Sequence, residues 1–187
     1  MGITDLVLAG IWIVFWAYWF VTAFLMRSSY KRMQSSGSVL LLIILVVAIW
    51  SIVMELGPSP AMHFIPKNTG TELAGLSITI LGLAVAIWAR VHLGRYWSAR
   101  PGIKQDHQLI RTGPYRLVRN PIYTGLLIGY AGTAIFIGEL WAFIIVILLF
   151  IAFLGKIRAE EKFLLEEFGD VYEEYRREVK SLIPFLV

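Results

Sequence analysis

The sequence predicts an all-α integral membrane protein with five transmembrane helices and a cytoplasmic amphipathic helix at its C-terminal end. Hydrophobic residues make up 58% of the 187 residues, charged residues only 16%, and the mean hydropathy is +0.70. These values lie outside the usual balance of a soluble domain. Five apolar segments carry no charged residue and approach or reach the roughly 20 helical residues that span a bilayer. They are residues 6–26, 37–54, 73–89, 122–138 and 140–155.

The first three segments are joined by connections of different character. Segment 6–26 has no basic region before it and no small-residue cleavage site after it, so we interpret it as a retained helix rather than a secretory signal. The connection 57–71 contains Pro58, Pro60 and Pro66, which predicts an external loop. Segment 73–89 leads into alternating charged and aromatic residues, and we expect its helix to end near Gly94.

The last two segments predict an antiparallel helical hairpin, because only a very short turn at Glu139 separates them. Gly125, Gly129 and Gly132 leave one face of segment 122–138 bare enough for close approach of another membrane helix. Beyond residue 155 the apolar residues recur at helical spacing among charged ones, which predicts an amphipathic helix broken at Gly169.

The distribution of basic residues predicts the orientation of the chain. Of the 17 lysines and arginines, only Lys67 falls on the loop face that the predicted helices assign to the outside. Cytoplasmic loops carry the excess of Lys and Arg, so we expect the N-terminus outside and the C-terminus and any site in the cytoplasm. The net charge of +4 is explained by this topology, and no nucleic-acid partner is expected beside the lipid bilayer.

Several site classes are excluded or disfavoured by composition. The chain has no cysteine, which excludes disulfides, thiolate metal ligands and Cys nucleophiles. His63, His92 and His107 are scattered and no HExxH motif is present, so we expect no metal site. No GxGxxG motif follows a strand, so a Rossmann cofactor domain is not supported.

A polar, basic segment at residues 107–123 stands out between the apolar ones. It reads His-Gln-Leu-Ile-Arg-Thr-Gly-Pro-Tyr-Arg-Leu-Val-Arg-Asn-Pro-Ile-Tyr, and the predicted hairpin returns Glu160 and Glu161 toward it. Polar groups near hydrocarbon are costly unless they are paired. Our hypothesis is that a charged cofactor is the partner of this segment.

Short motifs follow one another between roughly residues 90 and 187. They are Gly113-Pro-Tyr115, Arg119-Asn-Pro-Ile-Tyr123, Glu160-Glu161, Phe168-Gly-Asp-Val-Tyr172-Glu-Glu-Tyr175 and Ile183-Pro184. In this order and spacing they resemble the isoprenylcysteine carboxyl methyltransferase family, whose members use S-adenosylmethionine and methylate the carboxylate of a prenylated C-terminal cysteine. The family commonly has His where this chain has Asn120, and Arg where it has Lys156.

The resemblance implies a lipophilic small-molecule or prenylated peptide substrate, with Lys156 as the cation that orients it. We expect one membrane domain over residues 1–187, in which residues 1–91 supply the first three membrane helices and residues 92–187 form the catalytic part, with the cofactor loop, the helical hairpin and the C-terminal helix. The implied cofactor site consists of His107, Gln108, Leu109, Ile110, Tyr115, Asn120, Pro121, Ile122, Tyr123 and Glu160.

The chemistry of the side chains agrees with this assignment. Glu160, together with Glu161, offers negative charge for the cationic groups of S-adenosylmethionine. Arg119 with Asn120 offers hydrogen-bond donors for its carboxylate, and Leu109 with Ile110 offers apolar walls for its adenine. A carboxylate acceptor is already ionised at pH 7, so Lys156 and Glu160 would act by positioning and no strong general base is required.

Other interpretations of the same residues stay open. His107 is alternatively a surface loop residue, Tyr115 and Tyr123 interface anchors, Lys156 a snorkelling lysine, and Glu160 its i, i+4 partner. Alternative functions are methylation of a phospholipid amine or small thiol, an NADPH-dependent sterol-reductase-like enzyme, and a non-catalytic membrane scaffold. The sequence leaves the methyl acceptor and the oligomeric state undetermined.

Overall fold

The computed structural model describes residues 2–25, 63–94 and 109–183, and all regular secondary structure in these ranges is helical. The helices are α1 (Ile3–Leu25), α3 (Thr69–Leu93), η3 (Gly113–Arg116), α4 (Pro121–Ile137), α5 (Leu140–Phe168) and α6 (Asp170–Glu178). The predicted segment 37–54 lies outside the described residues, as do His107 and Gln108. The prediction of an all-α protein is therefore confirmed wherever the chain is described.

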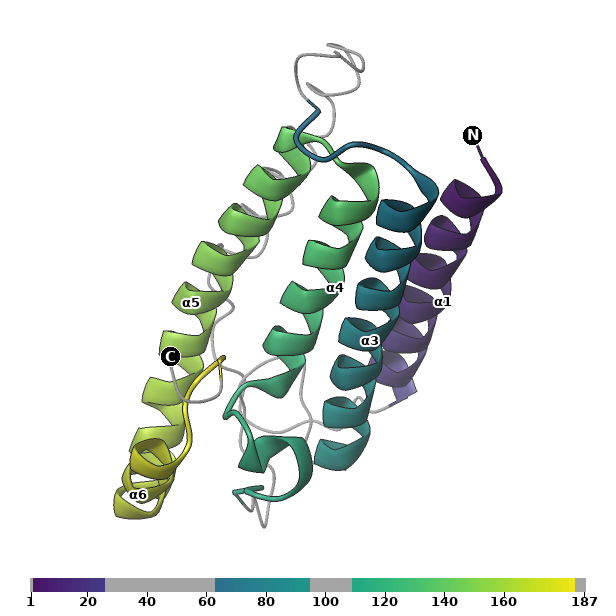
Figure 1. Ribbon diagram of the computed structural model, residues 1–187. Helices are drawn as coiled ribbons and strands as arrows, with labels where there is room; N and C mark the ends of the chain where they lie inside the picture. Colours follow the sequence, from purple (N-terminus) through teal and green to yellow (C-terminus); the bar gives the residue numbers. More distant parts are fainter. Residues whose placement is uncertain (1, 26–62, 95–108, 184–187) are drawn as a thin grey trace.

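Helices α1, α3, α4 and α5 lie side by side, and η3 and α6 lie together near one end of this layer (Figure 1). Within the described ranges, Ile3–Thr22, Thr69–Leu93 and Leu140–Phe168 are long and apolar enough to cross a membrane, while α4 is a shorter apolar helix. The count of five spans stays a prediction, because one of the five segments is not described.

The end of the layer opposite η3 and α6 carries the N-terminus of α1 and the start of α3 (Figure 1). Lys67 lies there, with its Nζ 3.3 Å from Asp5 Oδ1 and 3.8 Å from Glu72 Oε1. Helix α3 begins here because Asn68 and Thr71 form a reciprocal capping box. Among the described lysines and arginines, Lys67 alone lies at this end, as the charge distribution predicts.

Glycines bring α3 and α4 into backbone contact, as the Gly125, Gly129 and Gly132 pattern predicts. A Cβ added at Gly82 would stand 2.3 Å from the backbone nitrogen of Gly129 and 2.6 Å from the carbonyl oxygen of Gly125. Thr79 lies in the same contact, where its hydroxyl is 2.9 Å from the carbonyl of Gly75 and 3.2 Å from that of Gly129. The α3–α4 pair is thus the tightly packed frame from which the segments at its ends extend.

Replacing Gly82 by alanine should destabilise the protein by about 1 to 3 kcal/mol, because the added methyl meets backbone atoms that cannot rotate away. The unfolding midpoint in mixed detergent, followed by the helical circular dichroism signal, measures the effect. Gly155→Ala is the matched control, since nothing lies within 4 Å of its added Cβ. Equal midpoints for Gly82→Ala and the parent would contradict the described α3–α4 contact.

Helices α4 and α5 form the predicted antiparallel hairpin. Gly138 ends α4 with a φ of 75°, and α5 begins two residues later at Leu140. An added Cβ at Gly138 would also stand 2.6 Å from the carbonyl oxygen of Ile65, so both the conformation and the space favour glycine. Gly94 and Gly169 end α3 and α5 at the predicted positions. The hairpin returns the far end of α5 to the start of α4.

Candidate active site

The segment that precedes α4 is shaped by a glycine turn and two prolines. Gly113 adopts a φ of 61° and lies directly against the ring of His92, whose Nε2 is 2.8 Å from Thr112 Oγ1. Pro114 follows in η3, and Pro121 occupies the first turn of α4, where a missing N–H costs no helical hydrogen bond. The turn therefore places residues 119–123 beside one end of α5. The sequence predicts that this end lies on the cytoplasmic side.

A group of three polar side chains, Tyr123 on α4 with Lys156 and Glu160 on α5, joins the two helices at this end. Tyr123 donates a hydrogen bond of 2.9 Å to Glu160 Oε1, and Lys156 Nζ lies 3.8 Å from the same oxygen. The Lys156 ammonium also lies 5.6 Å from the centroid of the Tyr123 ring. The side chains of Lys156 and Glu160 keep 37% and 27% of their surface exposed. A carboxylate and an ammonium are thus held together and remain accessible.

Glu161 is engaged very differently from its neighbour Glu160. Arg119 donates to it from Nε at 3.0 Å and from Nη2 at 2.9 and 3.1 Å, so both carboxylate oxygens are bonded. Arg119 Nη1 donates to the carbonyl oxygens of Arg176 and Val179. With side-chain exposures of 8% for Arg119 and 16% for Glu161, this is a largely buried bidentate pair.

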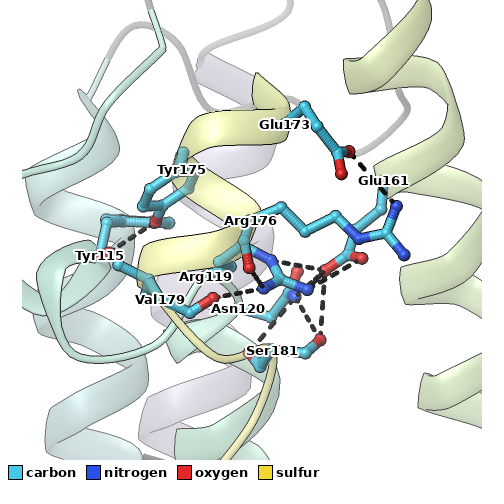
Figure 2. Close-up of polar contacts among 9 residues, drawn as sticks. All are labelled: Tyr115, Arg119, Asn120, Glu161, Glu173, Tyr175, Arg176, Val179 and Ser181. Carbon is cyan, nitrogen blue, oxygen red and sulfur yellow. Dashed lines mark hydrogen bonds and ion pairs between the residues drawn. The ribbon is translucent and has the colours of Figure 1, made fainter. Parts of the chain in front are cut away.

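Residues 179–182, which we call the C-terminal strap, lie along the start of α4. The backbone N–H groups of Arg119 and Asn120 donate to the carbonyls of Lys180 and Ser181 at 2.8 and 3.0 Å. Thr124 Oγ1 lies 2.7 Å from the carbonyl oxygen of Leu182. Figure 2 shows Arg119, Asn120 and Ser181 converging on Glu161. The strap thus joins the chain after α6 to the segment before α4.

Tyr115 and Tyr175 connect η3 to α6. The Tyr175 hydroxyl donates to the backbone carbonyl of Tyr115 at 2.5 Å (Figure 2), and the Tyr115 hydroxyl donates to the carbonyl of Ala89 at 3.4 Å. Burial raises the pKa of Tyr115 and of Tyr175 far above the ordinary phenol value. Both phenols therefore stay protonated donors, and in this structure Tyr115 ties η3 to α3.

The remaining predicted site residues are only partly brought together. Leu109 and Ile110 are half-buried, and Pro121 is fully buried. Ile122 packs against the core cluster that contains Phe15 and Leu126. His107 and Gln108 lie outside the described residues. The cofactor-binding assignments, including those of Arg119 and Glu161, stay predictions.

Two residues that hold the site together have no signal in the sequence. Ser181 and His92 make contacts with residues distant in the chain: Ser181 with Asn120 at a sequence separation of 61, and His92 with Thr112 at a separation of 20. A lone serine near the C-terminal end of the described chain has the same local pattern as a solvated surface serine. Only the fold reveals these partners.

Together these features define a multi-pass integral membrane protein with a carboxylate and an ammonium at one end of a helical hairpin. The family model "Phospholipid methyltransferase" matches residues 71–171, more than half of the chain. The chain therefore belongs to the phospholipid methyltransferase family.

Curated relatives indicate which methyltransferases the chain resembles. The probable protein-S-isoprenylcysteine O-methyltransferase of Oryza sativa subsp. indica is 36% identical over 115 residues, 60% of this chain and 60% of the relative. The protein-S-isoprenylcysteine O-methyltransferase of Saccharomyces cerevisiae is 37% identical over 142 residues, 68% of this chain and 56% of the relative. The chain thus spans about three fifths of the length of these relatives. The predicted resemblance to isoprenylcysteine carboxyl methyltransferases is confirmed.

A solved structure supports the same relationship. The eukaryotic intramembrane Ras methyltransferase, isoprenylcysteine carboxyl methyltransferase, matches with a TM-score of 0.60 and 25% identity. The match covers 82% of this chain and 55% of the solved one. The helical layer is therefore similar to the fold of a membrane methyltransferase.

Proposed function

We propose that this protein is an S-adenosylmethionine-dependent membrane methyltransferase that O-methylates the carboxylate of a prenylcysteine-like lipophilic substrate. The family membership and the names of the relatives support the reaction class. We assign the reaction to this site because the carboxylates of Glu160 and Glu161 differ in their hydrogen bonds. Both oxygens of Glu161 are bonded to the protein, whereas within the described ranges Glu160 Oε2 accepts no hydrogen bond.

The described residues suit the proposed cofactor. Glu160 offers a partly exposed carboxylate for its cationic groups, and Leu109 and Ile110 offer half-buried apolar surface. S-adenosylmethionine, when bound, supplies an electrophilic methyl group on a positively charged sulfonium. His107 and Gln108 belong to the proposal through the resemblance alone. Because Arg119 and Glu161 satisfy each other, we propose a framework role for this pair.

Lys156 suits the proposed acceptor. Its ammonium lies 3.8 Å from Glu160, so it would hold a substrate carboxylate beside the residue that holds the cofactor's cationic groups. That carboxylate is ionised at pH 7, because ordinary carboxyl pKa values lie near 4. The residues of the site would therefore accelerate the reaction by orientation and exclusion of water rather than by proton abstraction.

A phospholipid amine is the second candidate acceptor, favoured by the description of the matching family model. A protonated amine would meet the Lys156 ammonium at the site, and two like charges repel each other. The local charge therefore favours the carboxylate acceptor over the amine.

The test of the cofactor is the melting temperature of the purified protein in detergent. Micromolar S-adenosylhomocysteine should raise it, because a ligand that binds only the folded state stabilises that state by mass action. NADPH is the comparison ligand, since a polyanionic dinucleotide suits the carboxylate of Glu160 poorly. A shift with NADPH and none with S-adenosylhomocysteine would establish the reductase alternative instead.

We further propose one membrane domain with five spans, the N-terminus outside, and the site and α6 in the cytoplasm. The clustering of the described basic residues at the η3 and α6 end supports this orientation. Reporter fusions after Lys67 and after Val187 should report opposite sides of the membrane. If both fusions report the same side, the topology is wrong.

A further inference from the structure

We propose that Ser181 is a positioning residue of the candidate active site, acting through Asn120 and Glu161. This inference rests on the proposed methyltransferase function and adds a residue that neither the sequence motifs nor the comparisons assign. Ser181 lies in the C-terminal strap, which follows α6 (Figure 2).

The Ser181 hydroxyl lies between two polar side chains. Its Oγ accepts a hydrogen bond of 3.0 Å from Asn120 Nδ2 and donates one of 3.2 Å to Glu161 Oε1. Asn120 Nδ2 also lies 3.2 Å from the same Glu161 oxygen. The three side chains therefore form a closed triangle in which each contacts both others.

The two partners of Ser181 in this triangle, Asn120 and Glu161, each lie close in the chain to a residue of the candidate active site. Glu161 follows Glu160 on α5, and Asn120 stands three residues before Tyr123 at the start of α4. The Tyr123–Glu160 hydrogen bond of 2.9 Å crosses from α4 to α5 beside the triangle. By fixing the distance between the two helix ends, Ser181 sets the position at which Glu160 meets the cofactor.

The strap is held in place by groups other than the Ser181 side chain. Backbone hydrogen bonds join it to Arg119 and Asn120, Thr124 bonds to Leu182, and the Leu182 side chain is 1% exposed. Removing the hydroxyl should therefore leave the fold and the strap in place while the triangle opens. We therefore expect the substitution to weaken ligand binding while it leaves the stability of the protein nearly unchanged.

The test compares Ser181→Ala and Ser181→Thr in the full-length protein in detergent. For Ser181→Ala we expect the dissociation constant of S-adenosylhomocysteine and the KM for S-adenosylmethionine to rise roughly fivefold, the effect of losing about one net hydrogen bond. The KM for a farnesylcysteine analogue and the melting temperature should stay close to those of the parent. Ser181→Thr keeps the hydroxyl and should restore both cofactor parameters.

Ser77→Ala is the matched control, because the exposed Ser77 hydroxyl donates to the Leu73 carbonyl of its own helix and, among the described residues, has no other hydrogen-bond partner. Equal cofactor parameters for Ser181→Ala and Ser77→Ala would overturn the positioning role. A melting temperature that falls in parallel with affinity, without rescue by Ser181→Thr, would overturn it as well. A parent protein that neither binds S-adenosylhomocysteine nor transfers methyl groups would overturn the proposed function and this role with it.

Discussion

Replacing Glu160 by glutamine should weaken the binding of S-adenosylhomocysteine by about 1.5 to 3 kcal/mol, the range for a hydrogen bond to a charged group. Glutamine has nearly the same shape and keeps an oxygen that accepts the Tyr123 hydrogen bond. It lacks the negative charge that would pair with the ammonium group of the ligand. The helical hairpin should stay intact, so the loss belongs to the ligand rather than to the fold.

Isothermal titration calorimetry of the parent and the Glu160→Gln variant measures this difference. Glu166→Gln is the matched control, because Glu166 lies on the same helix, is exposed, and in the described part of the chain forms an ion pair with Lys162 alone, at 3.9 Å. Surface pairs of this kind contribute little, so the control should bind like the parent. Unchanged binding by Glu160→Gln would place the cofactor's cationic groups elsewhere.

Replacing Lys156 by methionine should reduce methyl transfer to a farnesylcysteine analogue while S-adenosylhomocysteine binding stays nearly intact. The ammonium is proposed to orient the acceptor carboxylate, so its loss affects the substrate and the transition state rather than the cofactor. A charge-assisted contact of about 1.5 to 3 kcal/mol corresponds to roughly a 10- to 150-fold fall in kcat/KM. Methionine keeps an apolar side chain of similar length but lacks the ammonium, which lies 5.6 Å from the centroid of the Tyr123 ring.

Two further variants make this result specific. Lys156→Arg keeps the charge and supplies a bidentate donor, so it should retain most of the activity. Lys162→Met removes an exposed lysine six residues further along the same helix and should behave like the parent. Retained transfer by Lys156→Met to an amine or thiol would reject the carboxylate acceptor but keep the methyltransferase. If both Lys156→Met and Glu160→Gln match the parent, the pair is only a surface salt bridge.

The helices and their ends follow from local sequence. Apolar segments without charge must satisfy their backbone hydrogen bonds internally, so they form helices in a membrane. Gly94, Gly138 and Gly169 end three of these helices because each adopts a positive φ that disfavours other residues. The short turn at Glu139 then requires α4 and α5 to be antiparallel. Glu160 therefore had to return toward Tyr123, and the structure places them in contact.

The pairing of charges across the site depends on the tertiary structure. An ionisable residue near the membrane needs a partner, and the sequence indicated that need for Arg119 and Glu161 without indicating where the partner lies. The structure brings these two together over 42 residues and adds Ser181 from beyond α6. That pairing bonds both carboxylate oxygens of Glu161 to Arg119, whereas the described contacts of the Glu160 carboxylate, with Tyr123 and Lys156, are made through one oxygen. Local patterns determine where helices form, but the distance between side chains on different helices is determined only when the helices pack.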